Sequence, residues 1–197
     1  MGISLSKQQT ISLEKGGQGL TRIFMGLGWD VVKPKKRGFL GLGGGAPADI
    51  DLDASCVAFA AGGRHLETVY FGQLTGLKGA VKHGGDNLTG AGEGDDERIY
   101  VDLTQLPAEV QTLVFTVNSF RGQTFDQVEN AFCRVVDQGG GKEDEVARLN
   151  LGEQGSHTGL VMVKVARGGS GWQLTAIGDK LEGRTAKELV PALGRYV

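Results

Sequence analysis

The sequence predicts an all-β protein, a two-layer antiparallel β-sandwich of about ten short strands with a few short helices. Apolar residues alternate with a period of two far more often than with the helical period of 3.6. The chain contains 34 glycines and only 4 prolines, a composition typical of many turns. Few segments have the pattern of helices that would connect parallel strands, which favours an antiparallel sandwich.

Ten segments have the strand pattern, and turns rich in Gly, Asn and Asp separate them. The alternation is clearest for Ile23, Met25 and Leu27, and again for Ile99 and Val101. In chain order the expected strands are residues 10–13, 20–28, 54–61, 66–71, 98–103, 112–117, 131–137, 145–151, 160–166 and 172–177.

Two segments have helical signals. Residues 124–130 are expected to form a turn or two, with Thr124 as N-cap, and residues 185–193 a C-terminal helix capped by Thr185. Pro191 is expected to limit the length of that helix. No linker or repeat divides the chain, and 40% of its residues are hydrophobic, so residues 1–197 are expected to form one domain with a sizeable core.

Composition excludes several classes of protein. The net charge of −2 provides no overall basic field for nucleic acid, so no specific nucleic-acid partner is expected. The N-terminal segment has no apolar signal region, and no apolar run approaches the ~18 residues that span a bilayer. We therefore expect a cytoplasmic protein that is not itself transmembrane. Cys56 and Cys133 are expected to be small buried hydrophobes, although a single disulfide between them stays open.

Motifs for phosphate loops, dinucleotide binding, zinc ribbons, zinc proteases and serine nucleophiles are absent from the sequence. His65, His83 and His157 are isolated, and no group of residues has the pattern of a nucleophile with its base. An enzyme is therefore the weaker hypothesis, and we expect no catalytic residues.

The most distinctive feature is the acidic, glycine-rich segment 84–97. It contains five acids, Asp86, Glu93, Asp95, Asp96 and Glu97, and no Lys or Arg lies between Lys82 and Arg98. Repulsion among close carboxylates costs about 1 kcal/mol per exposed pair, and Ca²⁺, which takes six to eight oxygen ligands, would offset it. Asn87 and Thr89 add neutral oxygens. The alternative is a solvated acidic loop.

Two further places extend this acidic set. Asp49, Asp51 and Asp53 alternate with apolar residues, which predicts the start of a strand with three carboxylates on one face. These three carboxylates either bind a cation or, in the alternative interpretation, face solvent at a sheet edge. Asp30 follows another strand and is either a ligand or a turn former.

A basic and then glycine-rich segment, residues 33–47, is expected to be a mobile loop between two strands. Its cationic start and the apolar residues that follow would contact anionic lipid or nucleic acid only weakly, and the alternative is a solvated loop.

Four blocks together carry a family resemblance: MGLGWD (25–30), DIDLDASC (49–56), GDNLTGAGEGDDE (85–97) and the stretch 118–137. The chain resembles the TerD family of tellurium-resistance and stress proteins and is most similar to its TerZ branch. The resemblance implies a Ca²⁺-binding β-sandwich in the bacterial cytoplasm, linked to tolerance of tellurite and other stresses. It also implies assembly with other Ter proteins, including a membrane-bound one, and no established catalytic activity.

The resemblance implies two or more Ca²⁺ ions held by the acidic segment and nearby aspartates. Where the family often reads GEGDGDDE, this chain reads GAGEGDDE, so Ala91 removes one acid and one ion site is expected to be weaker. The implied metal ligands are Asp30, Asp49, Asp51, Asp53, Asp86, Asn87, Thr89, Glu93, Asp95, Asp96 and Glu97.

These observations lead to a ranked set of functions. The first is a calcium-binding, non-catalytic stress protein whose ions tie the acidic segment to the sandwich. The second, compatible with it, is an adaptor that docks on other Ter proteins or on the membrane through a calcium-stabilised surface. The third is an enzyme that acts on an oxyanion or phosphoester at an exposed metal.

Overall fold

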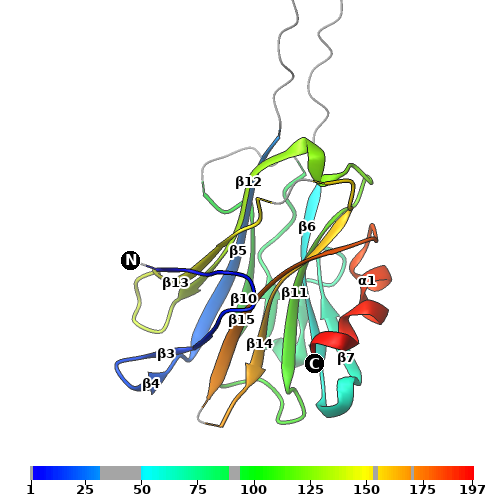
Figure 1. Cartoon of the computed structure of the whole chain (residues 1–197). Helices are drawn as coiled ribbons and strands as arrows, with labels where there is room; N and C mark the ends of the chain where they lie inside the picture. The colour runs from blue at the N-terminus through cyan, green and yellow to red at the C-terminus, as the bar shows by residue number, and fades with distance from the viewer. Residues whose placement is uncertain (1, 32–49, 89–93, 153–154, 170) are drawn as a thin grey trace, which may run out of the picture.

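The structure is a computed structural model that describes residues 2–31, 50–88, 94–152, 155–169 and 171–197. It consists of two β-sheets that face each other, with a C-terminal helix on the outside of the second (Figure 1). The predicted mobile loop at 33–47 lies outside the described residues.

The first sheet has seven strands. In spatial order they are β1 (Ile3–Ser4), β13 (Asp144–Asn150), β12 (Val128–Asp137), β5 (Arg22–Val31), β10 (Glu97–Asp102), β9 (Val81–His83) and β8 (Thr75–Gly76). The second sheet has six strands, β2 (Thr10–Ser12), β15 (Trp172–Leu181), β14 (Gly159–Arg167), β11 (Thr112–Ser119), β6 (Leu52–Phe59) and β7 (His65–Val69). A separate hairpin joins β3 (Glu14–Lys15) to β4 (Gln18–Gly19).

The predicted β-sandwich is confirmed, and each of the ten expected segments coincides with a strand. Two details differ. The strands β1, β3, β4, β8 and β9 were not expected, because two or three residues are too few to show a period. The pairing of β1 with β13 is parallel, whereas every other pair that the structure describes is antiparallel.

The main core lies between the sheets and contains the inward residues that the alternation predicted, among them Ile23, Met25 and Ile99. In β10 buried residues alternate with half-buried ones, as expected for a strand with one face on the core. A second apolar cluster lies on the outer face of the second sheet, where Leu189 and Leu193 pack over Val57 and Val114. The sandwich therefore buries apolar side chains in two layers.

The helix α1 (Ala186–Leu193) confirms the predicted C-terminal helix. The hydroxyl of Thr185 accepts a hydrogen bond from the backbone N–H of Glu188 at 3.3 Å, which is the expected N-cap. Pro191 lies inside the helix, which continues two residues beyond it. Four 3-10 turns complete the described structure, η1 (Ala61–Gly63), η2 (Leu77–Gly79), η3 (Phe125–Gln127) and η4 (Gly194–Tyr196).

The helical expectation at 124–130 was only partly correct. Residues Phe125–Gln127 form a 3-10 turn, but the Thr124 side chain makes no cap, and β12 begins at Val128. Val128 and Glu129 pair with the end of β5, so sheet pairing overrides the local helical signal.

Both cysteines are buried and free, which excludes a disulfide between them. Burial raises the pKa of both thiols. Among the described residues, no helix has the length and apolar character that a membrane crossing requires.

Candidate metal centre

The candidate centre forms where one strand of the second sheet extends past its neighbour. The edge strand β7 pairs with β6 only from Cys56 onward, so the start of β6 has no strand on that side. The described ends of the segment between β9 and β10, which is the predicted acidic loop, lie beside this gap. Its end residues therefore meet the aspartates that precede and begin β6.

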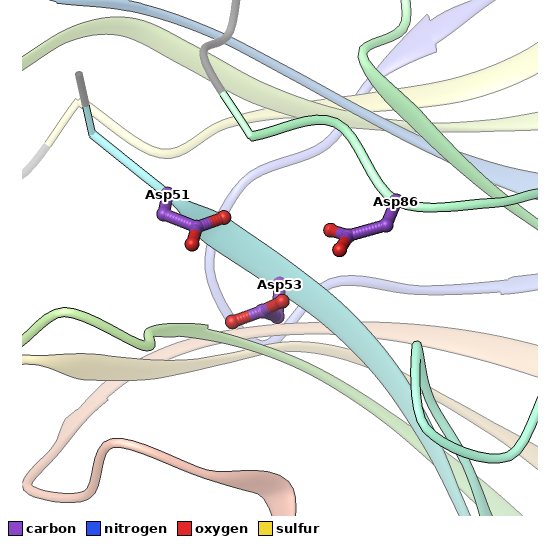
Figure 2. Close-up of side chains that lie close together, drawn as sticks. All are labelled: Asp51, Asp53 and Asp86. Carbon is purple, nitrogen blue, oxygen red and sulfur yellow. The ribbon is translucent and has the colours of Figure 1, made fainter.

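Three carboxylates converge there, those of Asp51, Asp53 and Asp86, and we call them the carboxylate cluster. One ligand oxygen from each lies within 4.8 Å of those of the other two. Figure 2 shows the side chains of Asp51 and Asp53 near the start of β6 and that of Asp86 pointing toward them from the opposite segment. Asp51 and Asp53 are 4% and 3% exposed, whereas Asp86 is open to solvent.

The burial of two of these carboxylates corrects one expectation. The alternative interpretation placed Asp51 and Asp53 on a solvent-facing sheet edge, but both side chains are buried, because Glu97 and His83 lie beside the start of β6 where β7 does not reach. Asp49 lies outside the described residues.

Few protein groups satisfy these buried carboxylates. Among the described residues, the Oδ1 atom of Asp51 has no hydrogen-bond partner, and its Oδ2 atom lies 3.4 Å from Nε of Arg121. The Oδ2 atom of Asp53 accepts one long bond, at 3.3 Å, from the amide of Asn118. A buried carboxylate without full hydrogen bonding is costly, because nothing replaces the water that it loses. Among the described residues, Arg121 is thus the one cation that pairs with these three carboxylates.

The pKa shifts have the same origin. Burial, and then repulsion from Glu97, Asp51 and Asp86, raises the pKa of Asp53 from 3.8 to about 8. Burial and the neighbouring Asp86 also raise the pKa of Asp51, although Arg121 opposes the shift. In the absence of a cation, Asp53 is therefore mostly protonated at neutral pH.

Glu97 and His83 take the place of the missing strand beside β6. The backbone N–H of Ala54 donates to Oε2 of Glu97 at 2.7 Å, and the carbonyl of Ala54 lies 3.2 Å from Nε2 of His83. The Nδ1 atom of His83 accepts from the N–H of Gly85, so Nε2 holds the proton and donates it toward Ala54. Both side chains are fully buried, and Glu97 also accepts from the N–H of Asn87.

Asp96 lies on the β5 side of the acidic loop. Its Oδ2 atom accepts from the backbone N–H of Trp29 at 2.9 Å, and its Oδ1 atom accepts from the amide of Asn87 at 3.0 Å. Burial is the main reason why the pKa of Asp96 is raised, and nearby Asp30 adds to the shift. Asp30 itself is exposed and accepts a bond from Asn130 at 2.8 Å.

Asp95 occupies a different environment from the other acids. Its buried carboxylate forms ion pairs with Arg134, at 2.6 Å, and with Arg98, at 2.9 Å. The carboxylate packs over Gly26, where any side chain would collide with it. A side chain at Gly28 would likewise collide with the backbone of the acidic loop and with Phe132. The two glycines of the GLG sequence thus allow the acidic loop to lie directly on β5.

The predicted ligand set therefore divides into parts. Asp51, Asp53 and Asp86 form the carboxylate cluster, whereas Asn87, Asp96 and Glu97 hold the loop to both sheets. Asp95 forms ion pairs with two arginines, and Asp30 lies beside Asp96. Thr89 and Glu93 lie outside the described residues. Asn118 and Arg121 were not expected, and only the strand register, which pairs Asn118 with Asp53, identifies the first.

Comparisons with known proteins agree with this architecture. A family model described as the TerD domain matches residues 1–190. The tellurium resistance protein TerZ of Serratia marcescens is 52% identical over 187 residues, which cover 95% of this chain and 94% of that protein. The stress response protein SCP2 of Bacillus subtilis is 41% identical, with 100% of both chains covered.

The fold also matches a solved structure. The crystal structure of a homologue of the telluride resistance protein TerD from Streptomyces coelicolor has a TM-score of 0.70 at 20% identity, covering 89% of this chain and 98% of that one. The domain match over nearly the whole chain and the identity to TerZ lead to one conclusion: this chain belongs to the TerD family of tellurium-resistance and stress proteins.

Proposed function

We propose that this chain is a calcium-binding, non-catalytic stress-response protein of the cytoplasm, associated with tellurite resistance, in which Ca²⁺ joins the acidic loop to the second sheet. One observation supports the proposal most directly. The carboxylate cluster contains two buried aspartates, and in the described part of the chain no group forms a hydrogen bond with the Oδ1 atom of Asp51. A cation at this point would favour the ionised form of these carboxylates and would supply a partner for the Oδ1 atom of Asp51.

The chemistry of the donors suits Ca²⁺. All three ligands are carboxylates, which are hard oxygen donors, and the cluster includes no histidine or cysteine. Three carboxylates provide up to six oxygens, and water would complete a shell of six to eight, because Asp86 is open to solvent. Magnesium is a poorer fit, since it gives up its water reluctantly and demands octahedral geometry.

The chain's own residues would do the positioning. Asn118 orients Asp53 while its amide also donates to the carbonyl of Arg184 at 2.7 Å. Glu97 and Asn87 anchor the loop that carries Asp86, so the ion would tie the connection between β9 and β10 to β6. We still expect two or more ions. Asp30 and Asp96 lie near each other on the β5 side of the acidic loop, and we propose them as ligands of a second ion.

Calorimetry tests the proposal. Chelator-stripped protein titrated with Ca²⁺ should release or absorb heat with saturation, and Mg²⁺ should bind at least tenfold more weakly. Asp86→Asn should weaken Ca²⁺ binding at least tenfold, because it removes the exposed ligand without disturbing the core. The matched control Asp126→Asn changes an exposed acid on η3 and should bind as the wild type does. Absence of heat, together with a melting temperature that Ca²⁺ does not change, would refute the proposal.

A second candidate function is that of an adaptor for other Ter-family proteins, including a membrane-bound one. The observation that favours it is a pair of exposed apolar side chains beside the cluster, Leu88 at 50% and Phe120 at 42% exposure. Phe120 donates its backbone N–H to the carbonyl of Asp51, so the ion and this surface would be coupled. Calcium-dependent association with a purified Ter protein should be lost in Leu88→Ser with Phe120→Ser and kept in Ile3→Ser, a similarly exposed site on β1.

A further inference from the structure

A second charged site lies at the other end of the first sheet. A cavity of about 270 Å³ is lined by Arg22, Lys78 and Lys82, together with Tyr100, Asp102 and two glutamines, Gln105 and Gln138. Arg22 begins β5, Asp102 ends β10, Lys82 lies in β9 and Lys78 lies in the turn η2. We call this site the cationic cavity.

Strand register places the charged groups on one face. Arg22 pairs with Asp102, and Tyr100 pairs with Lys82 on its other side. Their neighbours Ile23, Val101 and Val81 belong to the core between the sheets, so the alternation directs the charged residues outward. The helix α1 lies on the outer side of the other sheet (Figure 1). Glu97 and Asp102 are the two ends of β10, five residue steps or ~17 Å apart, so the cavity and the acidic loop lie at opposite ends of this strand.

No described residue gives the side chains of the cations in this cavity a hydrogen bond or an ion pair. Among the residues that the structure describes, Arg22 is the arginine whose side chain has no hydrogen bond or ion pair. The side chains of Lys78 and Lys82 also have none in the described part of the chain. In a chain with a net charge of −2, three such cations on one cavity form a local positive site.

The one acid in the cavity is already engaged. The Oδ1 atom of Asp102 accepts from the hydroxyl of Thr104 at 2.6 Å and from the backbone N–H groups of Thr104 and Gln105 at 3.0 and 3.2 Å. Asp102 attracts Arg22 electrostatically, but it balances only one of the three positive charges. The cavity therefore has room and charge for an additional anion.

We propose that the cationic cavity binds a small phosphate-bearing anion. An arginine offers a planar pair of donors that match two phosphate oxygens, and lysines add point charges that adapt to the rest. Gln105 and Gln138 supply neutral amide donors at the rim. The volume is just below the usual range for small-molecule sites, about 300–1,000 Å³, so it suits pyrophosphate or a compact phosphorylated metabolite. A phosphate headgroup at a lipid surface has the same chemistry.

The experiment uses the full chain in chelator, so that no calcium bridges the probe to the carboxylate cluster, and at constant ionic strength. Pyrophosphate binding is measured by calorimetry for the wild type and for a double variant, Arg22→Gln with Lys82→Gln. The matched control is Lys142→Gln, an exposed lysine outside the cavity. A parallel arm measures sedimentation with phosphatidylcholine vesicles, with and without phosphatidic acid.

The double variant should bind at least tenfold more weakly, and the control should bind as the wild type does. Binding of pyrophosphate alone assigns the cavity to a soluble phosphate, and binding to phosphatidic acid vesicles alone assigns it to a lipid headgroup. The inference is overturned if neither probe binds, or if the double variant binds as tightly as the wild type. A cooperative melting transition at the wild-type temperature, measured in the same chelator buffer, demonstrates that the double variant is folded.

Discussion

The metal-centre proposal gives Asp53 two roles: its buried carboxylate destabilises the metal-free protein, and it is a ligand of the ion. Replacing Asp53 with asparagine separates these two roles. Asn is nearly the same shape, keeps an oxygen for the Asn118 amide and removes the charge. In the metal-free protein the variant should be more stable than the wild type at neutral pH. In calcium it should lose the stabilisation that the wild type gains.

The magnitude follows from the pKa. A folded-state pKa of about 8 against 3.8 in the unfolded chain means that folding must keep Asp53 protonated at pH 7. This uptake of a proton costs up to about 4 kcal/mol at pH 7. An unpaired amide donor would offset about 1–3 kcal/mol of the gain. At about 2–4 °C per kcal/mol, the chelated variant should melt several degrees higher than the wild type.

Calcium works against this difference. At a hundredfold excess over Kd the ion stabilises the wild type by about 2.7 kcal/mol, or roughly 5–10 °C, and the variant should gain little. Scanning calorimetry in chelator and in calcium measures both shifts. The reasoning is refuted if the chelated variant melts lower than the wild type, or if its gain from calcium is undiminished. Asp144→Asn is the control, because its exposed carboxylate pairs with Lys15 far from the cluster, and it should leave the calcium response intact.

The same pKa predicts a pH dependence. Because the folded protein holds a proton that the unfolded chain releases, metal-free stability should decrease as the pH rises from about 4 to about 8. The slope is at most about 1.4 kcal/mol per pH unit for this group, and the raised pKa values of Asp51, Asp96 and Glu97 act in the same direction. Denaturant melts at several pH values measure it, and a metal-free stability that rises over this range would contradict the prediction.

Three further substitutions test the packing around the site. Gly28→Ala should cost about 1–3 kcal/mol and weaken calcium binding, since its methyl group would displace the acidic loop, and denaturant melts with calorimetry would detect both. Leu189→Ala should cost about 2–5 kcal/mol in thermal melts while leaving calcium affinity unchanged, because Leu189 packs on Val57 and Val114 and contributes no group to the carboxylate cluster. Asp95→Asn should cost about 3–5 kcal/mol, because Arg98 and Arg134 would lose a buried partner, yet its melting temperature should still rise with calcium; loss of that rise would make Asp95 a ligand.

The sequence by itself determined the sandwich, the ten main strands and the C-terminal helix. Period-two alternation and the Thr185 cap are local signals, and a strand with one buried face must show that alternation. Strands of two or three residues, such as β1, are too short to show a period, and they form because they pair with other strands in the tertiary structure. Pairing with β5 also decided that Val128 begins a strand, against the helical signal of the preceding residues.

The site shows the same division. Composition identified the acidic segment and the aspartates near residue 50 as one candidate set, because the density of charge is visible in the sequence. Only the tertiary structure decided that Asp51 and Asp53 are buried and meet Asp86, and that Arg134, 39 positions away, takes Asp95 out of that group. The physical reason is that electrostatic partners are set by distance in space. Strand register and sheet order bring together charges that no spacing in the sequence reveals.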